Sequence, residues 1–176
     1  MLQDHEQDLL REIALGAIAA ELDGRPHECD FPQQGPLAAL GSAFVTLRKG
    51  GRLRGCIGLV GHRHPLARSV QEAARRALTD SRFPRVTAEE LPDLDLEISV
   101  LSEFSELTDV EALMVGRHGL LVTTSGRSGL LLPQVAVEHE WDREAFLAHA
   151  CLKAGLPPEE WRRPDLKIEV FEALVF

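Results

Sequence analysis

Three stretches of the chain carry apolar residues every three to four positions, which is the spacing of an amphipathic helix. The first runs from Asp4 to Leu22, and Gly24 follows it with the freedom to adopt the left-handed conformation that ends a helix. The second runs from Pro65 to Leu78, and the third begins after Asp142, a residue type that caps helix N-termini. We expect the apolar stripes to face the core: Leu9, Leu10, Ile13, Ala17 and Ile18; Leu66, Val70, Ala73, Ala74 and Ala77; Phe146, Leu147, Ala150, Cys151 and Ala154.

Runs that favour β-structure lie between these helices. Residues 43–48 and 52–60 flank Lys49, Gly50 and Gly51, where glycine supplies the positive φ of a tight hairpin turn. Residues 120–124 and 129–135 form a second pair around a short turn that contains Gly126. Residues 94–101 alternate apolar and polar side chains as a half-buried strand does, and residues 166–176 close the chain as a strand.

Short helical turns are predicted by capping signatures. Thr87 with Glu90 forms a capping box, and Thr108 with Glu111 forms a second one, which opens a short helix running to Val115 and ending at Gly116. Two prolines at residues 157–158 open a last turn.

The two parts of the chain, residues 1–101 and 102–176, contain the same order of elements: hairpin, helix, helical turn, strand. We interpret this order as an internal duplication within one domain spanning residues 1–176. The sequence then predicts an α+β fold in which two similar halves share one curved sheet with flanking helices. The alternative is two unrelated stretches of common elements.

Composition narrows the class of protein. The 176 residues are 44% hydrophobic, enough for one globular domain with its own core. Nineteen Lys and Arg against 28 Asp and Glu give a formal net charge of −9, so the positive field that drives non-specific nucleic-acid binding is missing overall. No apolar run approaches the length of a membrane span, and the chain opens on acidic residues, so we expect a cytoplasmic protein without a membrane partner.

The three cysteines are Cys29, Cys56 and Cys151, which are far apart and form no CxxC motif. This pattern argues against a disulfide framework and against a structural zinc site. We treat each as a free thiol.

The least generic segment surrounds Cys56. Strict alternation along a strand places Arg54 and Cys56 on one face, and a neighbouring guanidinium favours the thiolate, which is the nucleophile and metal ligand. Gly55 and Gly58 remove bulk that would block a ligand or a close backbone approach. The alternative is that Cys56 is a small buried residue and that the glycines mark a bulge in a crowded sheet.

The hexapeptide at residues 53–58, LRGCIG, resembles the hallmark motif of the AMMECR domain family, whose bacterial and archaeal members are known as AmmeMemoRadiSam system protein A. The resemblance continues through DSRFP at residues 80–84, the strand at 94–101, GLLLPQV at 129–135 and Trp161, and so covers residues 9–176. One departure is the absence of tyrosine, since Phe171 stands where relatives often carry one.

The resemblance implies a fold of two similar halves on a single, partly barrel-like sheet. It implies no settled reaction and no cofactor. The system name implies partnership with a Memo-type protein and a radical SAM protein, and therefore a role as one component of a modification pathway.

Matched family positions that could carry chemistry define a candidate site. Cys56, His118 and Asp80 are the candidate catalytic residues, with Cys56 as nucleophile or sulfur contact, His118 as its base and Asp80 as an orienting or proton-transfer partner. The candidate substrate-binding residues are Arg54, Gly55, Gly58, Arg82, Glu97 and Gln134.

Each of these roles has a structural alternative. Asp80 and Arg82 could lock their loop to the sheet, Glu97 could be a solvated carboxylate, and His118 could cap the helix that ends at Gly116.

Two further groups of side chains could bind an ion. His62 and His64 have metal-ligand spacing but lack a third ligand nearby, so we expect no metal site. Arg75, Arg76, Arg82 and Arg85 form a basic cluster that could meet phosphate or RNA, although solvated helix charges are the simpler interpretation.

Two functional hypotheses follow. In the first, the protein is an enzyme or a substrate-binding component with a cleft around LRGCIG. In the second, it is a non-catalytic adaptor or interaction module, because no complete catalytic constellation stands out in the sequence.

Overall fold

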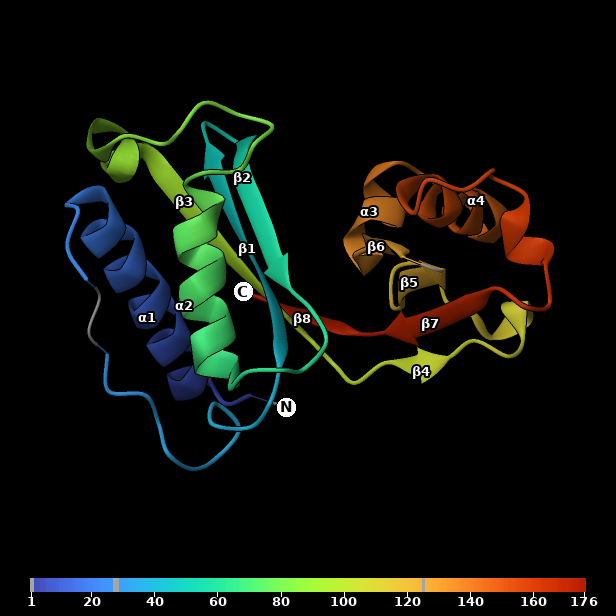
Figure 1. Cartoon of the computed structure of the whole chain (residues 1–176), viewed down its shortest axis with the longest axis horizontal. Helices are drawn as coiled ribbons and strands as arrows, with labels where there is room; N and C mark the ends of the chain where they lie inside the picture. Colours follow the sequence, from blue (N-terminus) through green and yellow to red (C-terminus); the bar gives the residue numbers. More distant parts are fainter. Residues whose placement is uncertain (1, 27–28, 125) are drawn as a thin grey trace. The chain divides into compact units, whose positions relative to one another are not determined.

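A computed structural model of the protein describes residues 2–26, 29–124 and 126–176. The chain divides into two compact units, drawn in Figure 1. Unit 1 comprises the residues up to Val100 together with Leu174–Phe176, and unit 2 comprises Leu101–Ala173. The last residues of the chain therefore return to unit 1.

Unit 1 packs two helices on a sheet, as Figure 1 shows. Helix α1 spans Asp4–Leu22, the bounds that the apolar periodicity predicts, and α2 spans Leu66–Ala77. The sheet has the order β2-β1-β3-β8, formed by β1 (Ser42–Lys49), β2 (Arg52–Leu59), β3 (Leu94–Leu101) and β8 (Ala173–Val175).

The core of unit 1 lies between these helices and the sheet. Leu10, Ile13, Ala17 and Ile18 of α1 are buried as predicted, whereas Leu9 is only partly buried. All five predicted core residues of α2 are also buried. Because aliphatic side chains removed from water supply the main favourable free energy of folding, these stripes fix both helices on the sheet.

The first hairpin forms as predicted, with one irregularity that bears on the site. Gly50 and Gly51 have φ of 56° and 74°, which is the left-handed geometry of the tight turn. Leu47 pairs with Gly55 and Arg48 pairs with Leu53, so Arg54 is an extra residue on β2. This β-bulge interrupts the strict alternation of side chains along the strand.

A short 3-10 helix, η1 (Ala88–Asp93), precedes β3. Its start confirms the predicted capping box, since the Thr87 side chain and the Glu90 side chain each bond to the other's backbone.

Unit 2 has its own sheet and core. The sheet order is β4-β7-β5-β6, formed by β4 (Ser105–Glu106), β5 (Gly119–Thr124), β6 (Arg127–Leu131) and β7 (Lys167–Phe171). Helix α3 (Pro133–Glu138) contacts β5, and α4 (Arg143–Lys153) covers β5 and β6. Asp142 caps α4 as predicted, and the predicted inner face of that helix is buried. Two 3-10 turns, η2 (Val110–Ala112) and η3 (Glu160–Arg162), complete the unit.

Three local predictions need correction. The run predicted as a strand over residues 129–135 ends at Leu131, because Pro133 has the fixed φ that starts α3. The cap of η2 is Asp109, whose side chain accepts from the Glu111 N–H, and not Thr108. The closing strand breaks at Glu172 into β7 and β8, which belong to different sheets.

The mixed α and β class is confirmed, but the single shared sheet is not. The described strands form two separate antiparallel sheets, and neither closes into a barrel. The order hairpin, helix, 3-10 turn, strand does occur in both units, while the internal duplication itself stays a prediction. Among the described helices, none has the length and apolar character needed to cross a membrane.

Candidate functional site

Cys56 lies on β2, an edge strand of the unit 1 sheet, opposite Thr46 of β1. A loop after α2 contacts the backbone of Cys56 through two side chains. Asp80 accepts the Cys56 N–H at 2.9 Å, and Arg82 donates from Nη2 to the Cys56 carbonyl at 3.2 Å. We call this pair the Asp80–Arg82 clasp. It satisfies the strand edge where a further strand would otherwise bind.

The clasp is held together by a charged pair. Arg82 donates from Nη2 to Asp80 at 2.6 Å and from Nε at 3.0 Å, and its backbone N–H donates to the same carboxylate at 3.1 Å. Asp80 is only 5% exposed. The hydrogen bond from the Arg82 side chain, aided by the two backbone N–H donors, holds the pKa of Asp80 well below its usual range. Asp80 is therefore an ionised acceptor at neutral pH.

Cys56 is half-buried and lies between two groups that can stabilise negative charge. The Thr46 hydroxyl donates to Sγ at 3.2 Å. The pKa of Arg82 is raised chiefly by its hydrogen bond to Asp80, and a hydrogen bond and Coulomb attraction to the Cys56 side chain act in the same direction. A hydroxyl donor therefore contacts the sulfur, and the Arg82 guanidinium donates to the carbonyl of the same residue.

The Arg54 side chain bonds to Glu90 and not to Cys56. Its guanidinium donates to both carboxylate oxygens of Glu90, at 3.0 and 2.8 Å, and to the carbonyls of Pro84 and Arg85. The Arg54 hydrogen bond is the largest cause that lowers the pKa of Glu90, to about 2. The bulge explains the direction of this side chain, which joins β2 to η1. A contact between Arg54 and substrate stays a prediction.

At both glycines of the motif, other atoms of the chain occupy the space where a side chain would stand. A Cβ at Gly55 would lie 2.2 Å from the Ala77 carbonyl oxygen, and a Cβ at Gly58 would lie 2.3 Å from the Phe44 ring. Gly55 therefore permits the close backbone approach that the sequence suggested, with the C-terminal end of α2. Ligand contacts at either glycine stay predictions.

The other predicted site residues lie apart from this cluster in the sequence. Glu97 is half-buried on β3 of unit 1. His118 and Gln134 belong to unit 2 and are also half-buried. His118 accepts the Met114 N–H at Nδ1, at 3.3 Å, which fits the alternative that it stabilises the turn after η2. Its pairing with Cys56 stays a prediction.

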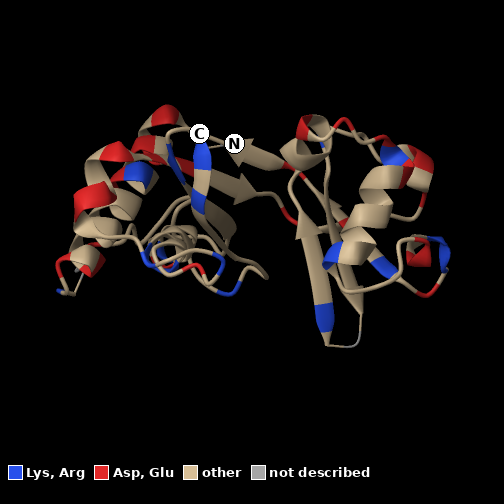
Figure 2. Ribbon diagram, turned by 90° about the horizontal axis from the view of Figure 1, so that it is seen from above, with Lys and Arg blue, Asp and Glu red and all other residues tan. Residues whose placement is uncertain are grey.

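The basic cluster is paired with acids. Arg75 bonds to Glu21 and Glu72 at 3.0 Å each, and Arg76 bonds to Glu72 at 2.6 Å. Arg85 lies 3.5 Å from Glu21, and Arg82 pairs with Asp80. Figure 2 shows the acidic and basic residues along the ribbon. Paired guanidinium groups fit the simpler interpretation of solvated helix charges.

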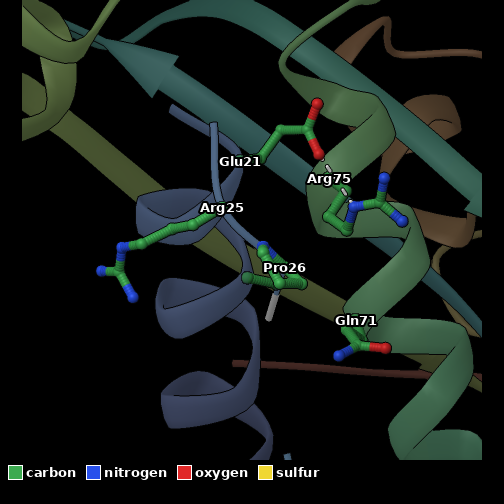
Figure 3. A pocket seen from close by; sticks show the side chains of 6 residues that line it. Glu21, Arg25, Pro26, Gln71 and Arg75 are labelled. Atoms are coloured by element: carbon green, nitrogen blue, oxygen red, sulfur yellow. Dashed lines mark hydrogen bonds and ion pairs between the residues drawn. The ribbon is translucent and has the colours of Figure 1, made fainter. Parts of the chain in front are cut away.

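A cavity of about 270 Å³ lies beside this cluster, between the end of α1 and α2. In Figure 3 the Glu21 carboxylate points toward Arg75, while Arg25 points away from both. Gln71 lies one helical turn from Arg75 on the same wall. Glu21 and Arg75 form an ion pair on this wall, so these two charges neutralise each other.

No metal centre is formed by the residues that the structure describes: nowhere do three or more His, Cys, Asp or Glu side chains gather as potential ligands. Cys29 is half-buried and Cys151 is buried, and burial raises the pKa of both thiols.

Sequence spacing predicted Arg54 as the guanidinium beside Cys56, and Arg82 was only a substrate-binding candidate. In the structure, Arg82 is the arginine that contacts Cys56. The signal that singled it out was the DSRFP segment, in which Arg82 lies 26 residues after Cys56.

Comparison with known proteins gives a consistent result. The family model described as AMMECR1 matches residues 11–176. Protein MK0488 of Methanopyrus kandleri is 44% identical over 181 residues, covering 97% of this chain and 87% of that protein. A protein of Methanothermobacter thermautotrophicus is 47% identical over 140 residues, covering 76% of this chain and 73% of its own length. The crystal structure of uncharacterized protein PH0010 from Pyrococcus horikoshii superimposes with a TM-score of 0.91 at 37% identity, covering 99% of this chain and 92% of that one.

Proposed function

Since the chain belongs to the AMMECR1 family, we propose that it is a substrate-binding or enzymatic component of a modification pathway and that Cys56 is its reactive group. One observation carries the proposal: a half-buried thiol that accepts from the Thr46 hydroxyl, on a residue whose carbonyl accepts from the guanidinium of Arg82. A positive charge beside sulfur favours thiolate, the form that attacks electrophiles. The buried Asp80 carboxylate fixes Arg82 in place.

The roles follow from these contacts. Cys56 is the nucleophile or a sulfur contact to substrate, and Asp80 is a positioning residue that acts through Arg82. Arg82 is half-exposed, so it has donors left for an anionic substrate group. His118 is the proposed proton-transfer group. Arg54, Gly55, Gly58, Glu97 and Gln134 complete the proposed substrate-binding set.

The proposed partners are a Memo-type protein and a radical SAM protein, in a cytoplasmic pathway. A second candidate function, a non-catalytic adaptor for these partners, is favoured by a different observation. The charged groups of Arg54 and Asp80 are bonded within unit 1, as expected where a motif serves the fold.

Thiol alkylation tests the proposal. In a protein with Cys29→Ser and Cys151→Ala, Cys56 is the sole thiol, and its modification by iodoacetamide can be followed by mass spectrometry. We expect modification of the folded protein, and we expect Arg82→Gln to slow it about tenfold, as loss of one charge-assisted interaction implies. Arg76→Gln removes a paired surface arginine of α2 and serves as the matched control, which we expect to leave the rate unchanged.

Two outcomes would contradict a reactive Cys56. The first is modification only after unfolding, which would make the thiol a part of the core. The second is a Cys56→Ser protein that restores pathway function in a deletion strain as well as the natural chain does. That second result, together with retained binding to the two partners, supports the adaptor.

A further inference from the structure

The clasp uses only part of the Arg82 guanidinium. Nε and Nη2 donate to Asp80, and Nη2 also donates to the Cys56 carbonyl at 3.2 Å. The Phe83 ring lies 5.6 Å from Cζ and contacts the face of the group. None of the described residues accepts a hydrogen bond from Nη1. Because the Arg82 side chain is 52% exposed, the N–H donors of Nη1 are open to a ligand.

The two charges of the clasp differ in exposure. The Asp80 side chain is only 4% exposed, and both of its oxygens accept hydrogen bonds from Arg82. One of them also accepts the Cys56 N–H. The pair is neutral as a whole, but its negative end is enclosed and its positive end faces outward. The electrostatic potential beside Cys56 on the side of Arg82 is therefore positive.

The segments around the clasp add no unpaired acid. Residues 31–71, which include β2, contain six Lys and Arg and no Asp or Glu, although the chain has a net charge of −9. Residues 81–88, the loop after Asp80, contain two arginines and no acid. Glu90, which bonds to β2, is paired with Arg54 at 2.8 Å. These segments therefore do not repel an anion from the thiol.

We infer that the site at Cys56 takes a small electrophile that carries a carboxylate group, which Arg82 binds through Nη1 next to the carbon that the thiol attacks. This substrate class rests on the proposed function, because it requires a reactive Cys56. The guanidinium already bonds to the backbone of Cys56, so the carboxylate and the reacting carbon must be neighbours in the compound.

The remaining donors of Arg82 favour a carboxylate over a phosphate. Asp80 occupies the Nε and Nη2 side of the guanidinium, which is an edge that forms bidentate pairs. Nη1 alone is left, and its N–H groups suit one oxygen of a singly charged group. A phosphate would bring further charged oxygens for which the clasp offers no donor.

Two alkylating reagents that differ in one group test this substrate class. Iodoacetate carries a carboxylate where iodoacetamide carries an amide. With either reagent the S–C bond forms, the C–I bond breaks, iodide leaves with the bonding electrons and the thiol proton goes to the buffer. Both reagents attack the same thiolate, so the ratio of their rate constants reports recognition of the carboxylate and is independent of how reactive the thiol is.

The measurement is made on the natural full-length chain. Trypsin cleaves after Arg54 and Arg63, and the peptide between them contains Cys56 as its sole cysteine, so mass spectrometry follows that thiol. Glutathione in the same solution is the reference. We expect the ratio of iodoacetate to iodoacetamide rate constants to be about tenfold higher at Cys56 than at glutathione, as one charge-assisted hydrogen bond implies.

The chain supplies an internal comparison and a matched control. Cys29 precedes Asp30, whose charge repels iodoacetate, so its ratio should not exceed that of glutathione. Arg82→Gln should reduce the ratio at Cys56 to that of glutathione. Arg52→Gln removes an exposed arginine of the same strand and should leave the ratio unchanged.

A competition experiment on the natural chain gives a second test, because Arg82→Gln also removes bonds of the clasp. Sodium acetate replaces sodium chloride at constant ionic strength, and we expect it to lower the ratio at Cys56 in a saturable manner. No effect of acetate on the ratio, or a stronger effect of inorganic phosphate than of acetate, would overturn the inference.

The outcomes distinguish the substrate class from the proposed function. If the folded protein reacts with iodoacetamide at Cys56 but the ratio equals that of glutathione, the thiol is reactive and the carboxylate class is wrong. If Cys56 reacts with neither reagent until the protein unfolds, the proposed function is wrong and the substrate class is overturned with it.

Discussion

Gly55 stands where no side chain fits, because the Ala77 carbonyl oxygen would lie 2.2 Å from its Cβ. Gly55→Ala must push the C-terminal end of α2 away from β2. We expect the free energy of unfolding to fall by about 3 kcal/mol, the upper range for overpacking against backbone. Urea denaturation measures the change.

The hairpin offers a matched control for that substitution. Gly50 has φ 56° and open space around its Cβ position. Asn is the residue that two-residue hairpin turns favour here, so Gly50→Asn should change stability by less than about 0.5 kcal/mol. Equal losses in the two variants would contradict the packing role of Gly55.

The depressed pKa of Asp80 predicts how the free energy of unfolding depends on pH. Its folded pKa is depressed, so its carboxylate contributes stability that is complete above the unfolded value of about 3.9 and is lost as the pH falls below it. Asp80→Asn should lower the free energy of unfolding by about 2 kcal/mol at pH 7, because it leaves the clasp without its charge. The difference from the natural chain should shrink at pH 3, measured by urea denaturation at each pH.

Asp23→Asn is the control, since Asp23 forms an exposed pair with Arg25. Such pairs contribute little, and we expect a change within about 0.5 kcal/mol at either pH. A deficit in Asp80→Asn that is the same at pH 7 and pH 3 would show that the lost interaction is not that of the ionised carboxylate.

The identity of the arginine beside Cys56 could not be predicted from the sequence. Spacing on an ideal strand put Arg54 beside the thiol, but a bulge turned that side chain toward Glu90. The guanidinium that contacts Cys56 belongs to Arg82. The DSRFP segment singled Arg82 out as a candidate, yet nothing local in the sequence gives a contact across 26 residues.

At the scale of elements, a stack of rings joins α3 to α4. Trp141 lies with its ring centroid 3.7 Å from that of His149 and 4.7 Å from that of His139, both nearly parallel. His149 is further held by the Ala145 carbonyl, 2.8 Å from Nδ1. A double-mutant cycle of Trp141→Ala and His149→Ala should give a coupling of about 1 kcal/mol in unfolding free energy.

The same cycle with His139→Ala is the internal comparison. His139 follows α3 and is exposed, and its ring lies farther from the indole. We expect a coupling below about 0.5 kcal/mol for that pair. A larger coupling for His139 than for His149 would contradict the assigned order.

Helices and strands with a strong apolar periodicity were predictable from the sequence. Elements whose end depends on a single residue were not. Helix α1 and strand β3 have the bounds that apolar periodicity gives. The end of β6 depended on Pro133, a helix-starting residue inside an apolar run that reads equally well as strand. Periodicity carries no information about such a switch.

At the scale of the whole molecule, the break at Glu172 determines the topology, because it divides the closing strand between two sheets. The apolar pattern of residues 166–176 is continuous, so it predicted one strand and one shared sheet. The choice of partner strands is made by long-range pairing, namely β7 with β4 and β5, and β8 with β3. Pairing of this kind is set by the tertiary fold and leaves little local signal.

This division predicts that the last three residues stabilise unit 1 specifically. Ile98 and Phe176 exchange two backbone hydrogen bonds, at 2.8 and 3.1 Å, and Arg11 lies over the Phe176 ring at 4.9 Å. Removal of residues 174–176 should therefore increase hydrogen exchange at the Ile98 amide and destabilise unit 1 by about 2 kcal/mol.

The comparison amide is Leu107 of unit 2, which donates to the Ile168 carbonyl at 2.9 Å and loses no partner in the truncated chain. Val175→Thr, a change at an exposed position of β8 that keeps the backbone, is the control for chain-end effects. Selective loss of protection at Ile98 means that β8 serves unit 1, whereas equal loss at Leu107 means that the two units unfold as one cooperative structure.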